Sequence, residues 1–178
     1  MKKRLIILVT TISFSFTLPL YMQDTEYLFK YGTRQQKISA INVFMRQKTL
    51  RELILLIDSL KDENEDLQIR KYIIHALKVF KSKRAKHAII WALECEISGL
   101  RSHAALVISK YPLNEVMYPI INALSDKSHK VRKNALLALF RIGNKSVLPF
   151  IRRMLRDNHP EVRFQARMTY RRILNKKQ

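Results

Sequence analysis

The sequence predicts an all-α protein, a right-handed α-solenoid of about four helix pairs that ends in a capping helix. Three observations lead to this prediction. The chain includes only 3 Gly and 5 Pro, too few for the turns of a many-stranded sandwich or barrel. The apolar content of 47% is too high for a disordered basic chain. An apolar residue followed by Arg recurs with a 31-residue period, and a fixed period of this length indicates stacked repeats.

Residues 1–22 have the layout of a targeting segment. Three cations in residues 1–4 precede a mainly apolar run, residues 5–18, that ends before Pro19. This pattern is typical of a secretory signal peptide, and the run is shorter than the about 20 apolar residues of a membrane-spanning helix. We therefore expect residues 1–22 to be a cleaved signal peptide, or alternatively a membrane anchor, and the protein to be periplasmic or membrane-associated.

The remaining residues, 23–178, are expected to form one repeat domain. The repeated dipeptides are Ile69-Arg70, Leu100-Arg101, Val131-Arg132 and Val162-Arg163. Apolar residues at three- and four-residue spacing follow each dipeptide, as in an amphipathic helix, and a turn and a second apolar stripe come next. The expected helix pairs cover residues 33–62, 63–96, 97–126 and 127–157, and the capping helix lies within residues 158–178.

Particular residues justify these boundaries in chain order. The first pair corresponds to the fourth at a constant offset along the chain, with a two-residue insertion in the acidic segment 62–66. Pro119 and Pro149 lie close to one period apart, and we place both near the start of a second helix, where a missing N–H costs nothing. Gly143 marks the turn inside the fourth pair. Pro160 marks the first turn of the capping helix.

Residues 123–139 and 155–166 resemble the HEAT repeat family, in the short form of the bilin-lyase-type HEAT-like proteins, and the resemblance extends over residues 33–178. In this family, an Asp six residues before an Arg takes part in a ladder of bonds between neighbouring repeats. The pairs with this spacing are Asp126/Arg132 and Asp157/Arg163. Asn64 and Cys95 occupy the Asp position of the two earlier repeats, so we expect the ladder to be incomplete there. The resemblance implies a fold and no particular function, because solenoids have many unrelated roles.

Positive charge is concentrated at the C-terminal end. The chain has 34 Lys and Arg against 14 Asp and Glu, and residues 126–178 hold 15 basic and 3 acidic residues, a net charge of +12. The candidate partner-binding residues are Arg152, Arg153 and Arg156 in the last second helix and Arg167, Arg171 and Arg172 in the capping helix. Such a surface attracts nucleic acid, anionic lipid or an acidic protein, unless the charge reflects composition and solubility alone.

No catalytic motif is present. The five His residues lack metal-ligand spacing, and 3 Gly cannot build a phosphate-binding loop. Cys95 is either a small packed side chain or a nucleophile beside His75 or His87. The acidic segment 62–66 is either a solvated loop or a cation site without the spacing of an EF-hand loop. These observations predict no metal, no cofactor and no enzymatic activity.

Two functions are compatible with this pattern. The first is a non-enzymatic scaffold of the cell envelope that binds an acidic protein partner through one face of the solenoid and can contact anionic membrane. The alternative is a nucleic-acid-binding protein, structural or similar to the HEAT-like alkylpurine DNA glycosylases, because neutralisation of phosphates by cations drives such binding. The export signal and the single Trp argue against the alternative. A lyase-type enzyme on the same repeat remains a fold analogy that no residue supports.

Overall fold

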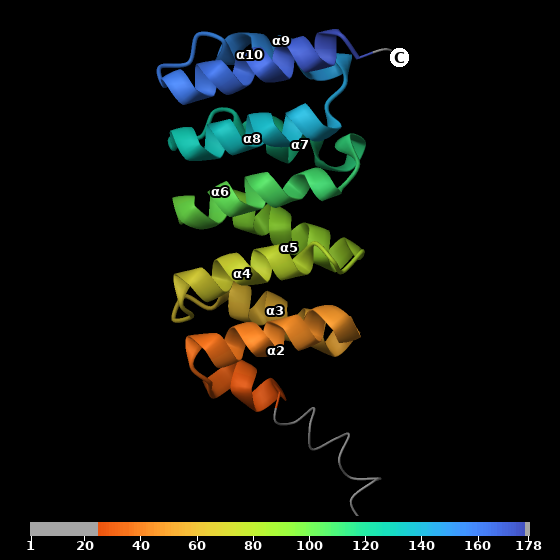
Figure 1. Cartoon of the computed structure of the whole chain (residues 1–178), viewed down its shortest axis with the longest axis vertical. Coiled ribbons are helices and arrows are strands. Elements are labelled where there is room, and N and C mark those ends of the chain that lie inside the picture. Colours follow the sequence, from red (N-terminus) through yellow and green to blue (C-terminus); the bar gives the residue numbers. More distant parts are fainter. Residues whose placement is uncertain (1–24, 177–178) are drawn as a thin grey trace, which may run out of the picture. The chain divides into compact units, whose positions relative to one another are not determined.

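A computed structural model describes residues 25–176 of the chain. Every regular element in this range is helical, and it contains no strand (Figure 1). This confirms the predicted fold class. The expected signal segment, residues 1–22, lies outside the described range. The chain divides into two compact units, one up to Gln47 and the other from Lys48, which are described separately.

The first unit contains a helical segment over residues 25–31 and the helix α2, Arg34–Gln47. Phe29 and Phe44 pack edge to face with their ring centroids 5.2 Å apart. The division after Gln47 falls inside the predicted first helix pair, so α2 is assigned to a different unit from the helix that follows it. The single domain over residues 23–178 therefore stays a prediction.

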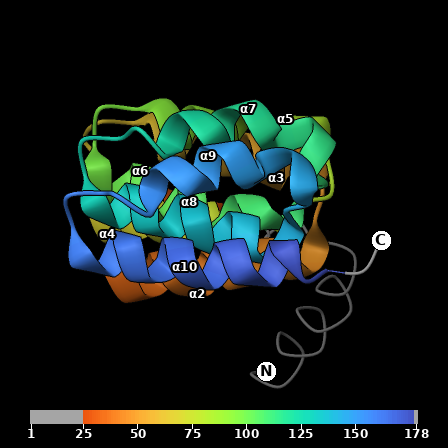
Figure 2. The same cartoon turned by 90° about the horizontal axis from the view of Figure 1, so that it is seen from above.

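The second unit contains two alternating sets of helices. The first helices of the pairs are α4 (Leu67–Leu77), α6 (Ser98–Val107), α8 (His129–Ile142) and α10 (Pro160–Leu174). The second helices are α3 (Leu50–Lys61), α5 (Lys83–Glu94), α7 (Leu113–Ala123) and α9 (Leu148–Met154). Short 3-10 turns, η1 (Ile108–Lys110) and η2 (Lys145–Val147), precede α7 and α9. Figure 2 shows the first helices along one side of this unit and the second helices along the other.

Local side-chain chemistry explains where several of these helices begin. Thr49 and Glu52 form a capping box at α3, in which the Glu52 carboxylate accepts a hydrogen bond from the Thr49 N–H at 2.6 Å. Asp66 caps α4 and Ser82 caps α5, each by accepting from backbone N–H groups of the first turn. These bonds satisfy donors that have no partner within the helix.

Proline marks the start of only some helices. Pro149 and Pro160 lie in the first turn of α9 and α10, as expected. The placement of Pro119 near a helix start was wrong, because α7 begins at Leu113 and contains Pro119 in its interior. The segment equivalent to the 3-10 turn η2 is already helical in the preceding pair, so α7 extends further toward its N-terminus than α9 does.

The apolar residue of each repeated dipeptide lies in the core of the stack. Ile69, Leu100, Val131 and Val162 are all 0% exposed. Burial of a side chain of this size contributes about 1.5–3 kcal/mol, which gives the period of the sequence its physical basis. Among the described residues, no helix combines the length and the apolar character needed to cross a bilayer.

Candidate functional site

The second member of each dipeptide, the arginine, joins consecutive repeats. Arg132 donates from Nε and Nη2 to the two carboxylate oxygens of Asp157, both at 2.8 Å. Arg101 makes the same two-pronged contact with Asp126, at 2.7 and 3.1 Å. The Nη1 group of Arg132 donates in the opposite direction, to the carbonyl oxygens of residues 126 and 127 at 2.8 and 3.1 Å. Each of these two arginines therefore connects the turn before its own helix to the turn before the next helix.

This arrangement differs from the predicted ladder in one respect. The Asp six residues before the arginine supplies only its main-chain carbonyl, and the carboxylate comes from the next Asp along the chain. Arg101 is therefore paired although Cys95 precedes it. The interruption lies at Arg70, because Cys95 occupies the position from which a carboxylate would reach it. Arg70 is 4% exposed and donates from Nε to the carbonyl oxygen of Leu60 at 2.8 Å.

The paired carboxyl groups stay ionised. Burial by itself raises the pKa of Asp157, but the hydrogen bonds from Arg132 and from the His159 N–H outweigh burial and lower that pKa below its ordinary value. The pKa of Asp126 is lowered in the same way: burial opposes the shift, and the bonds from Arg101 and the Ser128 N–H prevail. The ladder is therefore a set of ion pairs at neutral pH.

Ion pairing uses every acidic residue of the C-terminal segment. The three acids in residues 126–178 are Asp126, Asp157 and Glu161. The first two bind Arg101 and Arg132, and Glu161 binds Lys133 at 2.7 Å. The other basic residues that the structure describes in this segment are left without an acidic partner inside it.

The six candidate arginines are all exposed, and they are divided between α9, the residues after it, and α10. Arg152 and Arg153 lie in α9, and Arg156 follows that helix. In the register of the repeat, Arg152 corresponds to the half-buried Ile121, whereas Arg153 and Arg156 correspond to the exposed Asn122 and Ser125. The arginines of α10 also differ in their contacts.

Arg172 is turned back toward the preceding repeat. Its guanidinium lies 4.4 Å from the ring centroid of Phe140, a cation–π contact. Arg167 and Arg171 precede Arg172 in α10 and are exposed. Arg172 is therefore engaged in packing against the preceding repeat.

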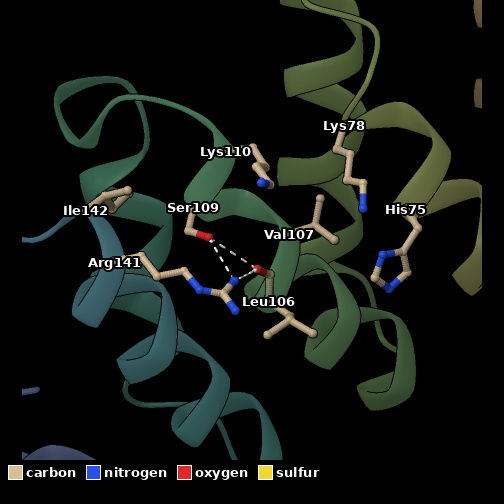
Figure 3. Close-up of a pocket in the computed structure, with 8 residues that line it drawn as sticks. All are labelled: His75, Lys78, Leu106, Val107, Ser109, Lys110, Arg141 and Ile142. Carbon is tan, nitrogen blue, oxygen red and sulfur yellow. Dashed lines mark hydrogen bonds between the residues drawn. The ribbon is translucent and has the colours of Figure 1, made fainter. Parts of the chain in front are cut away.

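A hollow of about 660 Å³ lies at the C-terminal ends of α4, α6 and α8 (Figure 3). Its basic residues are Lys78, Lys110 and Arg141, and none of the described residues that line it carries a carboxylate. Arg141 donates from Nη1 to the Leu106 carbonyl oxygen and to Ser109 Oγ, both at 3.3 Å. The basic groups can attract a carboxylate or a phosphate.

Sequence reasoning missed this hollow, although one signal was present. Lys110, Arg141 and Arg172 occupy the same position of three consecutive repeats, so each of these repeats brings a cation to the same end of its first helix. His75 lines the hollow as well. Burial, Lys78 and His103 lower the pKa of His75, so its imidazole is uncharged at neutral pH.

The remaining candidates for chemistry stay apart from one another. Within residues 25–176, no group of three or more His, Cys, Asp or Glu side chains could hold a metal ion. Cys95 is half-buried, and its thiol donates to the Ala92 carbonyl oxygen at 3.3 Å. His129 and His159 stack with their ring centroids 3.8 Å apart; His129 is the first residue of α8, and His159 directly precedes α10.

Helix pairs that recur with one period and are joined by arginine–aspartate ion pairs define a helical-repeat protein. Residues 117–175 match the sequence model of HEAT repeats, and the predicted resemblance is thereby confirmed. Comparison with curated proteins gives no match.

Among solved structures, the chain is similar to a chain in the complex of CpcE and CpcF of phycocyanin lyase from Nostoc sp. PCC7120. The TM-score is 0.64 and the sequence identity 18%, over 85% of this chain and 64% of that one. The present chain thus spans less than two thirds of the length of that relative. At this identity the similarity shows the fold alone.

This comparison corrects the prediction that the protein has no enzymatic activity. The similar chain belongs to a lyase complex, so a stack of this kind can form part of an enzyme. The lack of a familiar catalytic motif in the present sequence is therefore no ground for excluding enzymatic activity.

Proposed function

We propose that the chain binds an acidic protein partner through the basic surface of its last repeats. One observation carries this proposal: the three acids of residues 126–178 are all used in ion pairs, while exposed arginines on and after α9 and on α10 have no acid beside them in that segment. A surface of uncompensated cations attracts an anionic partner and accelerates its encounter.

A protein partner is favoured because a chain with this fold occurs in a complex with a second protein. The similar solved chain belongs to a complex of two proteins, and stacked helix pairs expose extended faces on which a second protein can lie. We place this binding in the cell envelope, because residues 1–22 have the layout of an export signal. N-terminal sequencing of the chain from cell fractions tests the location, and recovery of an intact Met1 from the cytosol would contradict it.

Nucleic acid is the second candidate, because the same cations would neutralise phosphates. Aromatic side chains argue against it. Single-stranded nucleic acid is usually bound by aromatic rings that lie between the cations. In the described part of the C-terminal segment, residues 126–176, Phe164 is the one exposed large aromatic residue.

The test compares two charge reversals of equal size. The first changes Arg152, Arg153 and Arg156 to Glu, and the matched control changes Lys81, Lys83 and Arg84, which lie just before and at the start of α5, to Glu. Binding to poly-L-glutamate, to a DNA duplex and to vesicles of anionic phospholipid is measured at low and at high salt, about 50 mM and about 200 mM.

The proposal expects poly-L-glutamate to bind the unmodified protein, and the first variant to bind it about tenfold more weakly, equivalent to ~1.4 kcal/mol. The control variant should change the affinity much less. Equal losses in both variants would show that net charge alone governs binding. Tight, strongly salt-dependent binding to DNA without binding to poly-L-glutamate would favour the nucleic-acid function instead.

A further inference from the structure

In the second unit, α6 and α8 contact the next first helix through a shared set of positions. For α8 and the turn and helix that follow it, the contacts are Arg132 with Asp157, Lys133 with Glu161, the Leu136 carbonyl oxygen with the Thr169 hydroxyl at 3.1 Å, and the Phe140 ring with Arg172. Ser102 in α6 and Ser109 in η1 correspond to Lys133 and Phe140, and both contact α8: Asn134 donates to Ser102, and Arg141 donates to Ser109. Arg141 also donates to the Leu106 carbonyl oxygen, which adds one further position to the set. We call this set of positions the forward face of a first helix.

The 31-residue period identifies the residues of α10 that correspond to the forward face. Its members there are Arg163, Phe164, Arg167, Met168 and Arg171. Phe164 is 59% exposed and Met168 43% exposed. The three arginines follow one another at four-residue intervals, so they lie in one row along the helix. The forward face of α10 is therefore a row of cations with two apolar side chains beside it.

Arg163 is already held in the orientation of a ladder arginine. Its Nη1 donates to the carbonyl oxygens of residues 157 and 158 at 2.8 and 3.0 Å, as the Nη1 of Arg132 does one repeat earlier. In Arg101 and Arg132, the other edge of the guanidinium, formed by Nε and Nη2, binds an aspartate. No carboxylate of residues 25–176 occupies that edge of Arg163.

A further repeat of the same composition would not suit this face. Arg167 corresponds in the register to Leu136, Ala105 and Ile74, which are at most 1% exposed. Covering Arg167 with apolar side chains would bury an unpaired charge, which is strongly unfavourable. An acidic side chain opposite Arg167 removes that cost.

We infer that the forward face of α10 binds an acidic amphipathic helix of a partner protein. One carboxylate takes the bidentate place on Arg163, a second side chain of the same row meets Arg167 and Arg171, and an apolar side chain covers Phe164. This inference rests on the proposed function and specifies the chemistry of the partner. A guanidinium fixed in advance loses little entropy when it binds, so the row selects for the spacing of the acids as well as for their charge.

The test uses two alanine-based helical peptides of identical composition. One carries Glu at every fourth position with Leu beside that row, and in the other the Glu residues are spread around the helix. The unmodified protein should bind the first peptide about tenfold more tightly than the second. Arg163→Lys, which keeps the charge and removes the fork, and Arg167→Ala with Arg171→Ala, which leaves the ladder intact, should each weaken binding of the first peptide severalfold.

Circular dichroism and thermal unfolding establish that each variant is folded, and the double variant keeps the test decisive if Arg163→Lys is destabilised. Equal affinity for the two peptides overturns the inference. The inference is also overturned if the Arg163→Lys variant and the double variant bind the first peptide as the unmodified protein does, while the reversal of Arg152, Arg153 and Arg156 abolishes binding. That outcome would leave the proposed function intact. If neither peptide nor poly-L-glutamate binds the unmodified protein, both proposals fail.

Discussion

Removing one carboxylate from the ladder tests how strongly the repeats are joined. In the Asp157→Asn variant, Arg132 loses its ionic partner, while an amide of almost the same shape remains in place. The side chains of Arg132 and Asp157 are 10% and 6% exposed, and two charged hydrogen bonds join them. Leaving such a guanidinium with a neutral partner costs about 1–3 kcal/mol. For a chain of this size that corresponds to a decrease in Tm of about 3–10 °C.

Urea and thermal unfolding followed by circular dichroism measure the effect. Glu161→Gln is the matched control, because it also removes one carboxylate from an ion pair that joins α8 to α10. The side chains of that pair, Lys133 and Glu161, are 38% and 56% exposed, and exposed pairs contribute little to stability. A control variant as unstable as Asp157→Asn, or an Asp157→Asn variant with an unchanged midpoint, would refute the assignment of the ladder as the joint.

Three further variants or conditions extend this reasoning. The pKa values of Asp126 and Asp157 are lower in the folded protein, so their contribution to stability is present above the unfolded pKa of about 3.9 and decreases as the pH falls through the folded values. Below about pH 4, the free energy of unfolding should therefore fall less steeply with decreasing pH in Asp157→Asn than in the unmodified protein, as measured by urea unfolding at a series of pH values. Cys95→Asp supplies the carboxylate that the Arg70 position lacks, and should raise stability by about 0.5–1.5 kcal/mol relative to Cys95→Ser in urea unfolding; lower stability would show that Arg70 cannot turn from Leu60. Gly143→Ala places a methyl group 2.4 Å from the Leu139 carbonyl oxygen and 2.6 Å from Ile173 Cδ1, and should lower stability by about 1–3 kcal/mol in thermal unfolding; an unchanged Tm would contradict the tight approach of α10 to this turn.

The fold could be predicted because its main signal is periodic. Ile69, Leu100, Val131 and Val162 recur at one spacing, and all four are fully buried. Fixed spacing in the sequence thus reports a fixed environment in the stack. Pro119 was misplaced because the start of α7 depends on the turn η1 before it, and this turn does not recur in the same form in every repeat.

The partners in the ladder could not be predicted from spacing. Arg132 has Asp126 shortly before it in the chain and Asp157 well after it, and both aspartates contact it. Only the directions of the two edges of the guanidinium decide which aspartate supplies a carboxylate. The same limit applies to the hollow around Arg141 and to the forward face of α10, which depend on how neighbouring helices are placed.

The missing carboxylate at position 95 has a consequence for the cooperativity of unfolding. In a linear array each repeat is stabilised only by its neighbours, so the array separates first where a junction is weakest. Arg101 and Arg132 reinforce the two later junctions, whereas Arg70 has no aspartate across the junction before α6. Amide hydrogens of α3 and α4 should therefore exchange with solvent through partial opening, at a lower free energy than those of α8. We therefore expect the cysteine at position 95 to set the boundary between the part of this unit that opens locally and the part that opens only when the whole unit unfolds.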